Sequence, residues 1–207
     1  MWKWFKKQFN DKTPPNPDQQ RYEEEEEEMS VRTPQEVAER ILALFAVIGK
    51  VYQGDTPEFK AWYQKHRIER YLSDDERYLL NVETLSEDDR IDFSWRSEAL
   101  VSLLWGIQVI DEMPVLNQHI NVYSINGVSD ILKDPERFQQ TIQLRPDAEL
   151  NEMEDMLYNQ HWRVRDAQLF GKPMPSELDP SVVYERRYGL SWLVGWGDDW
   201  DEVPTDT

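Results

Sequence analysis

The feature that most constrains this chain is a helix-start signal that recurs along it and is followed each time by apolar residues at helical spacing. The run Thr33–Glu36 combines an N-cap threonine, a proline at the first helical position and a capping-box glutamate. The run Ser73–Glu76 repeats the capping box, and Pro57, Pro146 and Pro180 open further apolar patterns. Strands do not alternate with helices. The sequence therefore predicts an all-α fold.

We expect one multi-helix domain over residues 30–207. The expected helices run from Pro34 to near Gly54, from Pro57 toward His66, from Asp74 past Leu80, from Ser94 to Asp111, over 128–133, over 135–143, from Pro146 to Gly171, and from Pro180 onward. Apolar residues cover more than one face of the segment from Ser94 to Asp111, which is typical of a helix in the middle of a bundle. The one expected exception to helix is a short strand near 121–125.

Residues 1–29 are predicted to be a mobile arm with three parts. The first is a basic amphipathic start, in which lysines flank the candidate membrane-contacting residues Trp2, Trp4, Phe5 and Phe9. A proline-containing linker over 10–22 and the acidic run Glu23–Glu28 follow. Because the basic start is short, it makes weak contact with an anionic membrane surface, docks on the folded body or frays.

The 207-residue chain has a net charge of −18 and no cysteine. The charge argues against nucleic-acid binding through phosphate neutralisation, and it would steer basic partners toward the protein. The lack of cysteine excludes a disulfide scaffold, a thiolate metal site and a cysteine nucleophile. Because no apolar run is long enough for a membrane span and no secretory signal pattern occurs, we expect a cytoplasmic protein.

Several charged residues lie beside core positions, where an unpaired charge is costly. Four polar residues follow one another at steps of four, three and four and so share one helix face: Glu154, Tyr158, His161 and Arg165. Others lie at the start of the buried helix and one turn into the last helix. The candidate pocket or ion-pair network consists of Arg96, Glu98, His161, Arg165, Glu185 and Arg186.

Two hypotheses fit this set of residues. In the first, arginine–carboxylate pairs between helices fix the helix register. In the second, the helices meet at one pocket whose arginines bind an anionic group, and His161 or Glu98 acts as acid or base. No catalytic or nucleotide-binding motif occurs, and His161 lacks metal ligands at helical spacing. We therefore predict no catalytic residue, metal or cofactor; an enzyme stays open, but a binding protein is favoured.

The end of the chain mixes acidic and aromatic residues. A solvated tail is the default for such a charged segment, but aromatic residues between the acids suggest that it packs back on the body. The candidate partner-binding residues are Trp196, Asp198, Asp199, Trp200, Asp201 and Glu202.

Together, these motifs resemble the bacterial family catalogued as domain of unknown function 4272. The similarity covers roughly residues 30–207 and rests on Arg96–Leu100 with Leu104 and Trp105, His161 and Trp162 with Arg165–Ala167, Glu185–Tyr188 with Trp192 and Leu193, and Trp200–Thr207. The resemblance implies a mostly helical domain and brings no activity and no catalytic residues. Gly189 replaces an alanine that is common in the family, and glycine weakens a helix.

The leading functional expectation is a cytoplasmic, acidic protein-binding module. An immunity or inhibitor protein that covers a basic toxin or effector is its most concrete form, because electrostatic complementarity speeds such association. The first alternative is an enzyme or small-ligand sensor that binds an anionic ligand in the Arg/His/Glu pocket. The second is a membrane-surface adaptor that uses residues 1–9.

Overall fold

The computed structural model describes residues 30–205. Its longer elements are α2 (Pro34–Gln53), α3 (Pro57–Lys65), α4 (Asp74–Asn81), α5 (Glu87–Ser94), α6 (Arg96–Gly106), α7 (Val128–Lys133), α8 (Pro135–Thr141), α9 (Asp147–Leu169) and α10 (Pro180–Leu193). The described residues also form the short 3-10 turns η2 (Ile68–Tyr71), η3 (Val122–Ser124) and η4 (Trp200–Glu202). No strand occurs within the described residues, so the all-α prediction is confirmed.

Three helices, α2, α4 and α5, begin at capping boxes. At α2 the Glu36 carboxylate accepts a hydrogen bond from the Thr33 backbone N–H at 2.8 Å, and the Thr33 hydroxyl accepts one from the Glu36 N–H. Ser73 forms the same reciprocal box at α4, and Ser86 forms one at α5. These bonds satisfy backbone N–H groups that a helix leaves unpaired at its start.

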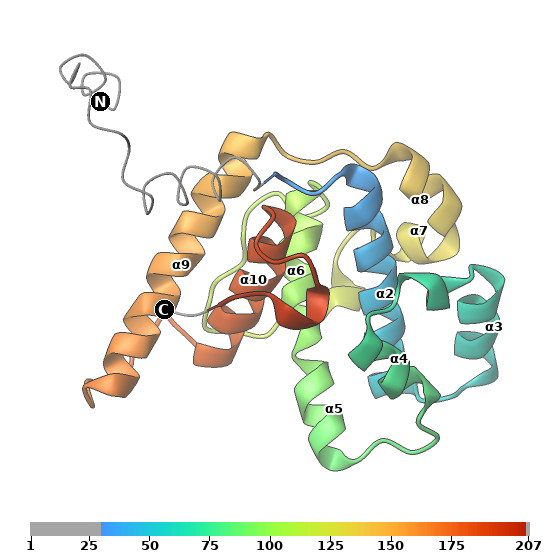
Figure 1. The fold of residues 1–207 in the computed structure, drawn as a ribbon, viewed down its shortest axis with the longest axis horizontal. Coiled ribbons are helices and arrows are strands. Elements are labelled where there is room, and N and C mark those ends of the chain that lie inside the picture. Colours follow the sequence, from blue (N-terminus) through green and yellow to red (C-terminus); the bar gives the residue numbers. More distant parts are fainter. Residues whose placement is uncertain (1–29, 206–207) are drawn as a thin grey trace, which may run out of the picture. The chain divides into compact units, whose positions relative to one another are not determined.

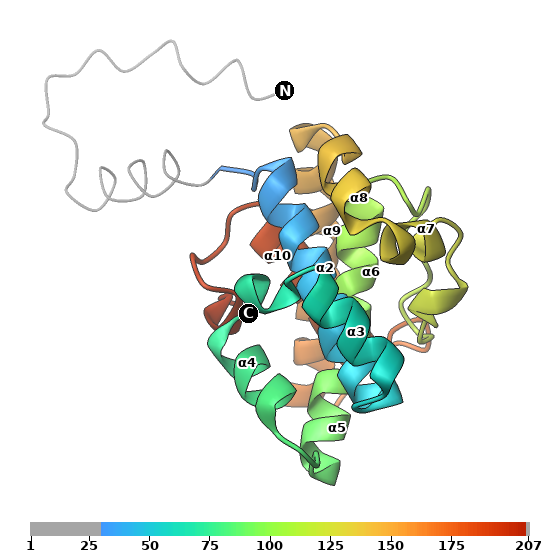
Figure 2. The same ribbon diagram turned by 90° about the vertical axis from the view of Figure 1, so that its right-hand side faces the viewer.

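Two helices, α2 and α6, form the centre of the fold. The middle of α2 is buried on nearly every face, because the small residues Ala38, Ala43 and Ala46 lie between its larger apolar residues. The neighbours of α2 are α3, α4, α5, α6 and α8, which surround it in Figures 1 and 2. Two cations, Arg40 and Lys50, are buried in α2 along with the apolar residues.

The last helix, α10, packs against both α6 and α9 (Figure 1). At Gly189 the two backbones of α10 and α6 approach so closely that an added Cβ would lie 2.5 Å from the Ala99 carbonyl oxygen. Glycine at this position therefore permits the helix contact, and its weak helix propensity is a secondary effect.

The segment from 94 to 111 differs from the single helix that we expected. The structure ends α5 at Ser94, begins α6 at Arg96 and ends α6 at Gly106. Arg145 causes the early end: its backbone N–H donates to the Gly106 carbonyl and its Nε donates to the Trp105 carbonyl, both at 2.8 Å. The backbone and the side chain of one distant residue thus each satisfy one of the last two carbonyls of α6, and Gln108 then turns the chain with a φ of 64°.

The predicted strand near 121–125 is instead the 3-10 turn η3. The Asn121 side chain accepts a hydrogen bond from the Tyr123 N–H, and the Asn121 carbonyl accepts one from the Ser124 N–H. A strand would need a neighbouring strand, whereas these local bonds satisfy the backbone without one.

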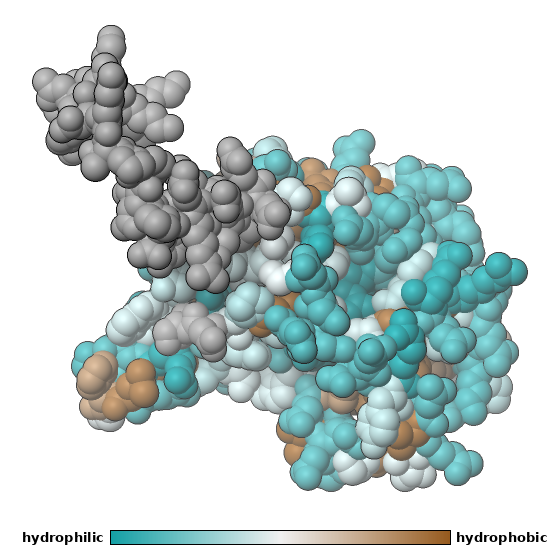
Figure 3. All heavy atoms as spheres, viewed as in Figure 1, coloured by the Kyte–Doolittle hydropathy of each residue, from teal (hydrophilic) through white to brown (hydrophobic). Residues whose placement is uncertain are grey.

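The amphipathic start, the linker and the glutamate run of residues 1–29 lie outside the described residues, as do their predicted membrane contacts. Within the part that is described, none of the helices combines the length and the apolar character that crossing a bilayer requires. Figure 3 shows a largely hydrophilic face with an apolar patch at the end of α9, where Leu169 and Phe170 are 63% and 67% exposed.

We predict that Gly189→Ala destabilises the protein although alanine favours helix. The added methyl group would meet rigid backbone, so we expect the free energy of unfolding to fall by about 1 to 3 kcal/mol. Gly106→Ala is the matched control, because its Cβ would meet side-chain atoms of Leu193 and Leu150, which can shift, and no backbone atom. Urea denaturation of both variants checks this, and a loss for Gly106→Ala as large as that for Gly189→Ala would contradict it.

Candidate functional site

Three consecutive residues of α10, Glu185, Arg186 and Arg187, each bind a different part of the fold. Consecutive helix residues point about 100° apart, so they cannot share one partner. The helices α6, α9 and α10 do pack together, as the hypothesis of a single pocket requires. The charged residues on them nevertheless form separate clusters around α10.

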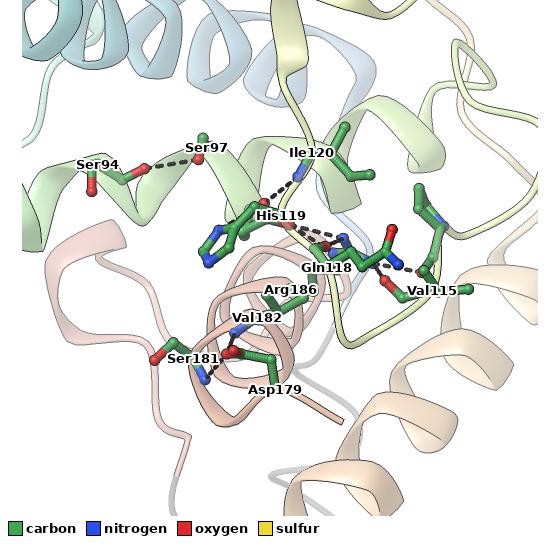
Figure 4. A network of polar contacts seen from close by, with 12 residues as sticks. Ser94, Ser97, Val115, Gln118, His119, Ile120, Asp179, Ser181, Val182 and Arg186 are labelled. Carbon is green, nitrogen blue, oxygen red and sulfur yellow. Dashed lines mark hydrogen bonds and ion pairs between the residues drawn. The ribbon is translucent and has the colours of Figure 1, made fainter. Parts of the chain in front are cut away.

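The first cluster is the buried ion pair between Glu98 and Arg186. The Glu98 Oε2 lies 3.0 Å from Arg186 Nε and 2.9 Å from Nη2, and both side chains are fully buried. Arg186 also donates to the Val115 carbonyl at 3.0 Å and the Gln118 carbonyl at 3.2 Å. The Glu98 Oε1 accepts the Ile120 N–H at 2.8 Å. Figure 4 shows Arg186 beside the loop residues Val115, Gln118 and Ile120. The pair therefore joins α6, α10 and the loop between α6 and η3.

Burial has the largest effect on the pKa of Arg186. Burial lowers the pKa of Arg186, and Glu98 opposes that effect. The imidazole of His119 covers the outer side of Glu98, with Nδ1 at 3.6 Å from Oε1, and its ring lies 4.4 Å from that of Trp95. With its hydrogen-bonding capacity filled inside the fold, this pair has the features of a structural ion pair.

The second cluster joins Arg96 to Glu185. Arg96 Nη1 lies 3.2 Å from Glu185 Oε2, and the guanidinium lies over the rings of Tyr188 and Trp200 at 4.5 and 5.9 Å. Burial raises the pKa of Glu185, and Arg96 opposes this. Burial also raises the pKa of Tyr188 to about 12, and its hydroxyl donates to the Trp200 carbonyl.

The third cluster centres on Arg187, which the sequence analysis did not single out. Arg187 Nη1 lies 2.8 Å from His161 Nδ1 and 3.0 Å from the Thr205 carbonyl, and Arg187 Nε lies 3.7 Å from Glu154 Oε1. Ser191 donates to the same Glu154 oxygen at 2.9 Å. The four-residue step from Arg187 to Ser191, set against Glu154 and His161 on α9, is a signal that could have found this cluster.

His161 is held in one protonation state and one tautomer. Burial, with Arg187 and Arg165 nearby, lowers the pKa of His161 from 6.5 to about 4, so the ring is neutral at neutral pH. Because a guanidinium only donates hydrogen bonds, His161 Nδ1 must accept from Arg187, and the ring proton resides on Nε2.

A cavity of about 600 Å³, here called the α9–α10 cavity, opens beside His161. Its lining residues are His161, Val164, Arg165, Gln168, Pro180, Ser181, Tyr184 and Thr205. Arg165 is exposed there and donates to Gln168 at 3.3 Å. The structure thus brings His161 and Arg165 together at one cavity and places Arg96, Glu98, Glu185 and Arg186 in the other clusters.

The segment after α10 packs back on the body. Asp201 accepts a hydrogen bond at 3.1 Å from the Asp75 N–H at the start of α4, and Arg32 donates to the Trp192 and Gly197 carbonyls. Trp200, expected among the partner-binding residues, is 5% exposed and belongs to the core. Its ring lies 4.8 Å from the guanidinium of Arg40 and also packs edge-on against Tyr188 and Trp192.

This segment forms one wall of a groove of about 450 Å³, here called the acidic–aromatic groove. Its lining residues are Glu36, Glu39, Arg40, Arg70, Tyr71, Leu72, Ser73, Trp192, Asp198, Asp199 and Trp200. Arg40 is already paired with Glu76 at 2.8 Å, whereas Asp198 and Asp199 are exposed. Of the other predicted partner-binding residues, Trp196 is 41% exposed, Glu202 is exposed and Asp201 is half-buried.

The other two histidines, His66 and His119, are both packed against neighbours. His66 is buried, and its Nδ1 lies 2.7 Å from Glu136 Oε1. Among residues 30–205, no group of three potential metal-ligating side chains has an arrangement that could hold an ion.

A family model matches residues 10–203 of the chain. The chain belongs to the family described as Domain of unknown function (DUF4272). The match begins before α2, so the DUF4272 region reaches further toward the N-terminus than the resemblance over 30–207 suggested. No curated protein and no solved structure gives a significant match. The DUF4272 assignment names no activity, so the function rests on the geometry.

We predict that the Glu98–Arg186 pair is sensitive to loss of one charge. Glu98→Gln keeps an acceptor for the Ile120 N–H but leaves the Arg186 charge uncompensated, so we expect it to destabilise the fold by about 3 to 5 kcal/mol. The control is Arg163→Gln, which breaks an exposed pair with Glu177 and should cost less than about 1 kcal/mol. Denaturant unfolding measures both, and equal losses would contradict the prediction.

We also predict a pH dependence that belongs to His161. At His161 the unfolded state binds a proton more readily than the folded state. The contribution of neutral, buried His161 to the free energy of unfolding is therefore fully present above about pH 6.5 and is lost as the pH falls toward 4. His161→Gln should remove this part of the slope, which we expect to be up to about 3 kcal/mol. The comparison uses unfolding free energies between pH 7 and 4. An unchanged slope in His161→Gln would refute the prediction.

Proposed function

We propose that this protein is a binding module for a basic partner protein, and that the acidic–aromatic groove receives a lysine- or arginine-rich segment of that partner. The observation that carries the proposal is the composition of the groove. Glu36, Glu39, Asp198 and Asp199 supply four carboxylates, whereas the arginines of the groove are already engaged: Arg40 pairs with Glu76, and Arg70 lies over the Tyr71 ring. A cationic side chain of a partner can pair with these carboxylates.

Two carboxylates of the groove, Glu36 and Asp199, are held in place before any partner arrives. Hydrogen bonds from Thr33 lower the pKa of Glu36, which keeps its carboxylate ionised at neutral pH. Asp199 caps the turn η4 by accepting the Asp201 N–H at 2.9 Å, and Trp200 anchors that turn in the core. A rim fixed in this way loses little conformational entropy on binding, which favours affinity.

The net charge of the whole chain supports the same kind of partner. A charge of −18 attracts basic proteins over a distance and speeds their encounter in a salt-dependent way. An immunity or inhibitor protein is the concrete form that we favour: it would act in the cytoplasm and cover a basic functional face of a toxin or effector. This form accounts for an acidic binding surface in a chain without a recognised catalytic motif.

The prediction is that neutralising the groove weakens partner binding specifically. A photo-crosslinking residue at position 198 captures the partner, and the purified partner is then titrated with the wild type and with the triple variant Glu39→Gln/Asp198→Asn/Asp199→Asn. We expect the Kd to rise by about tenfold or more, mainly at low salt, because several partly desolvated ion pairs are lost.

The control removes exposed carboxylates from another face with Glu152→Gln/Asp155→Asn on α9, which should change the Kd much less. The same test is repeated at two salt concentrations, since screening weakens contacts between exposed charges. A captured partner without a basic surface, or equal weakening by both sets of substitutions, would disprove the proposal.

A further inference from the structure

The α9–α10 cavity has the opposite chemical character from the acidic–aromatic groove. Among residues 30–205, none of those that line it carries a carboxylate, although the chain has 41 aspartates and glutamates. The nearby Asp166 is paired with Lys172 at 2.7 Å, and Asp179 accepts the N–H groups of Ser181 and Val182. In so acidic a protein, a hollow with an arginine and no carboxylate on its wall favours an anionic occupant.

The polar groups around the cavity are arranged mainly as hydrogen-bond donors. The guanidinium of Arg165 donates only, and the bond from Arg187 leaves the His161 proton on Nε2. His161 is only 5% exposed, so packing and the hydrogen bond from Arg187 fix its orientation. The hydroxyls of Ser181 and Tyr184 line the same hollow and can donate as well.

From these observations we propose that the α9–α10 cavity is a binding site for a small anionic molecule that presents phosphate or carboxylate oxygens. Arg165 pairs with the charge, and His161 donates its Nε2 proton to a second oxygen. The volume of about 600 Å³ exceeds that of a bare phosphate and lies within the usual range for small-molecule sites. This site is separate from the proposed protein-binding groove, so either proposal can fail without the other.

The test is a two-dimensional NMR titration of the full chain at constant ionic strength, with inorganic phosphate, pyrophosphate and succinate as separate probes. We expect saturable shifts at His161, Arg165, Ser181 and Tyr184 with at least one probe below about 10 mM. A response to the phosphates alone or to succinate alone decides which oxygen chemistry the site takes. Because Asp206 follows Thr205 in the sequence, the titration is repeated with Asp206→Asn to remove that carboxylate as a competitor.

Two matched substitutions separate a specific site from general charge attraction. Arg165→Gln should weaken binding by about tenfold, whereas Arg163→Gln, which removes the same charge from an arginine of α9 that pairs with Glu177, should leave it unchanged. His161→Gln keeps a donor and should bind better than His161→Phe, which has none. The proposal is overturned if no probe saturates in either the wild type or Asp206→Asn, or if Arg163→Gln and Arg165→Gln weaken binding equally.

Discussion

The buried ion pair between Arg186 and Glu98 is the interaction on which the rest of the structure depends. Arg186 pairs with Glu98 across the α6–α10 contact and donates to carbonyls of a loop that has no regular structure of its own. Buried carbonyls need donors, and apolar packing could not provide them. Once Arg186 fixes the rotation of α10, its two sequence neighbours must point elsewhere. Glu185 then meets Arg96, and Arg187 meets α9.

Features set by local bonds were predictable from the sequence, and features set by distant partners were not. The capping boxes at Thr33 and Ser73 involve residues three apart, so the starts of α2 and α4 follow from the sequence alone. The end of α6 depends on Arg145, almost forty positions from Gly106, and no periodicity in that helix could reveal it. The segment around η3 resembles a strand in sequence because β-branched and aromatic residues such as Val122 and Tyr123 favour strands. Whether a strand forms depends on a neighbouring strand to pair with, and the sequence of the segment does not show this.

The charged residues of the candidate site were recognisable by type, but their grouping was not. Burial cost alone indicates that Glu98, His161 and Arg186 must have partners. Which residues pair depends on helix rotation, and one step along α10 separates the Arg186 cluster from the Arg187 cluster. For the segment after α10, the sequence indicates the acidic residues Asp198 and Asp199, which line the acidic–aromatic groove, but not Thr205, which lines the α9–α10 cavity. The short segment after α10 thus lines both the acidic–aromatic groove, proposed to bind a cationic segment, and the α9–α10 cavity, proposed to bind an anion.

The ring of Trp200 links the turn η4 to α2, the first helix that the structure describes, because it packs against Arg40 of α2 as well as Arg96 of α6. During synthesis, α2 leaves the ribosome long before that ring exists. Until then Arg40 lacks its stacking surface, and α6 lacks α10, against which it packs. Folding of the core is therefore delayed until nearly the whole domain has been translated, and the nascent chain needs protection from aggregation for most of its synthesis.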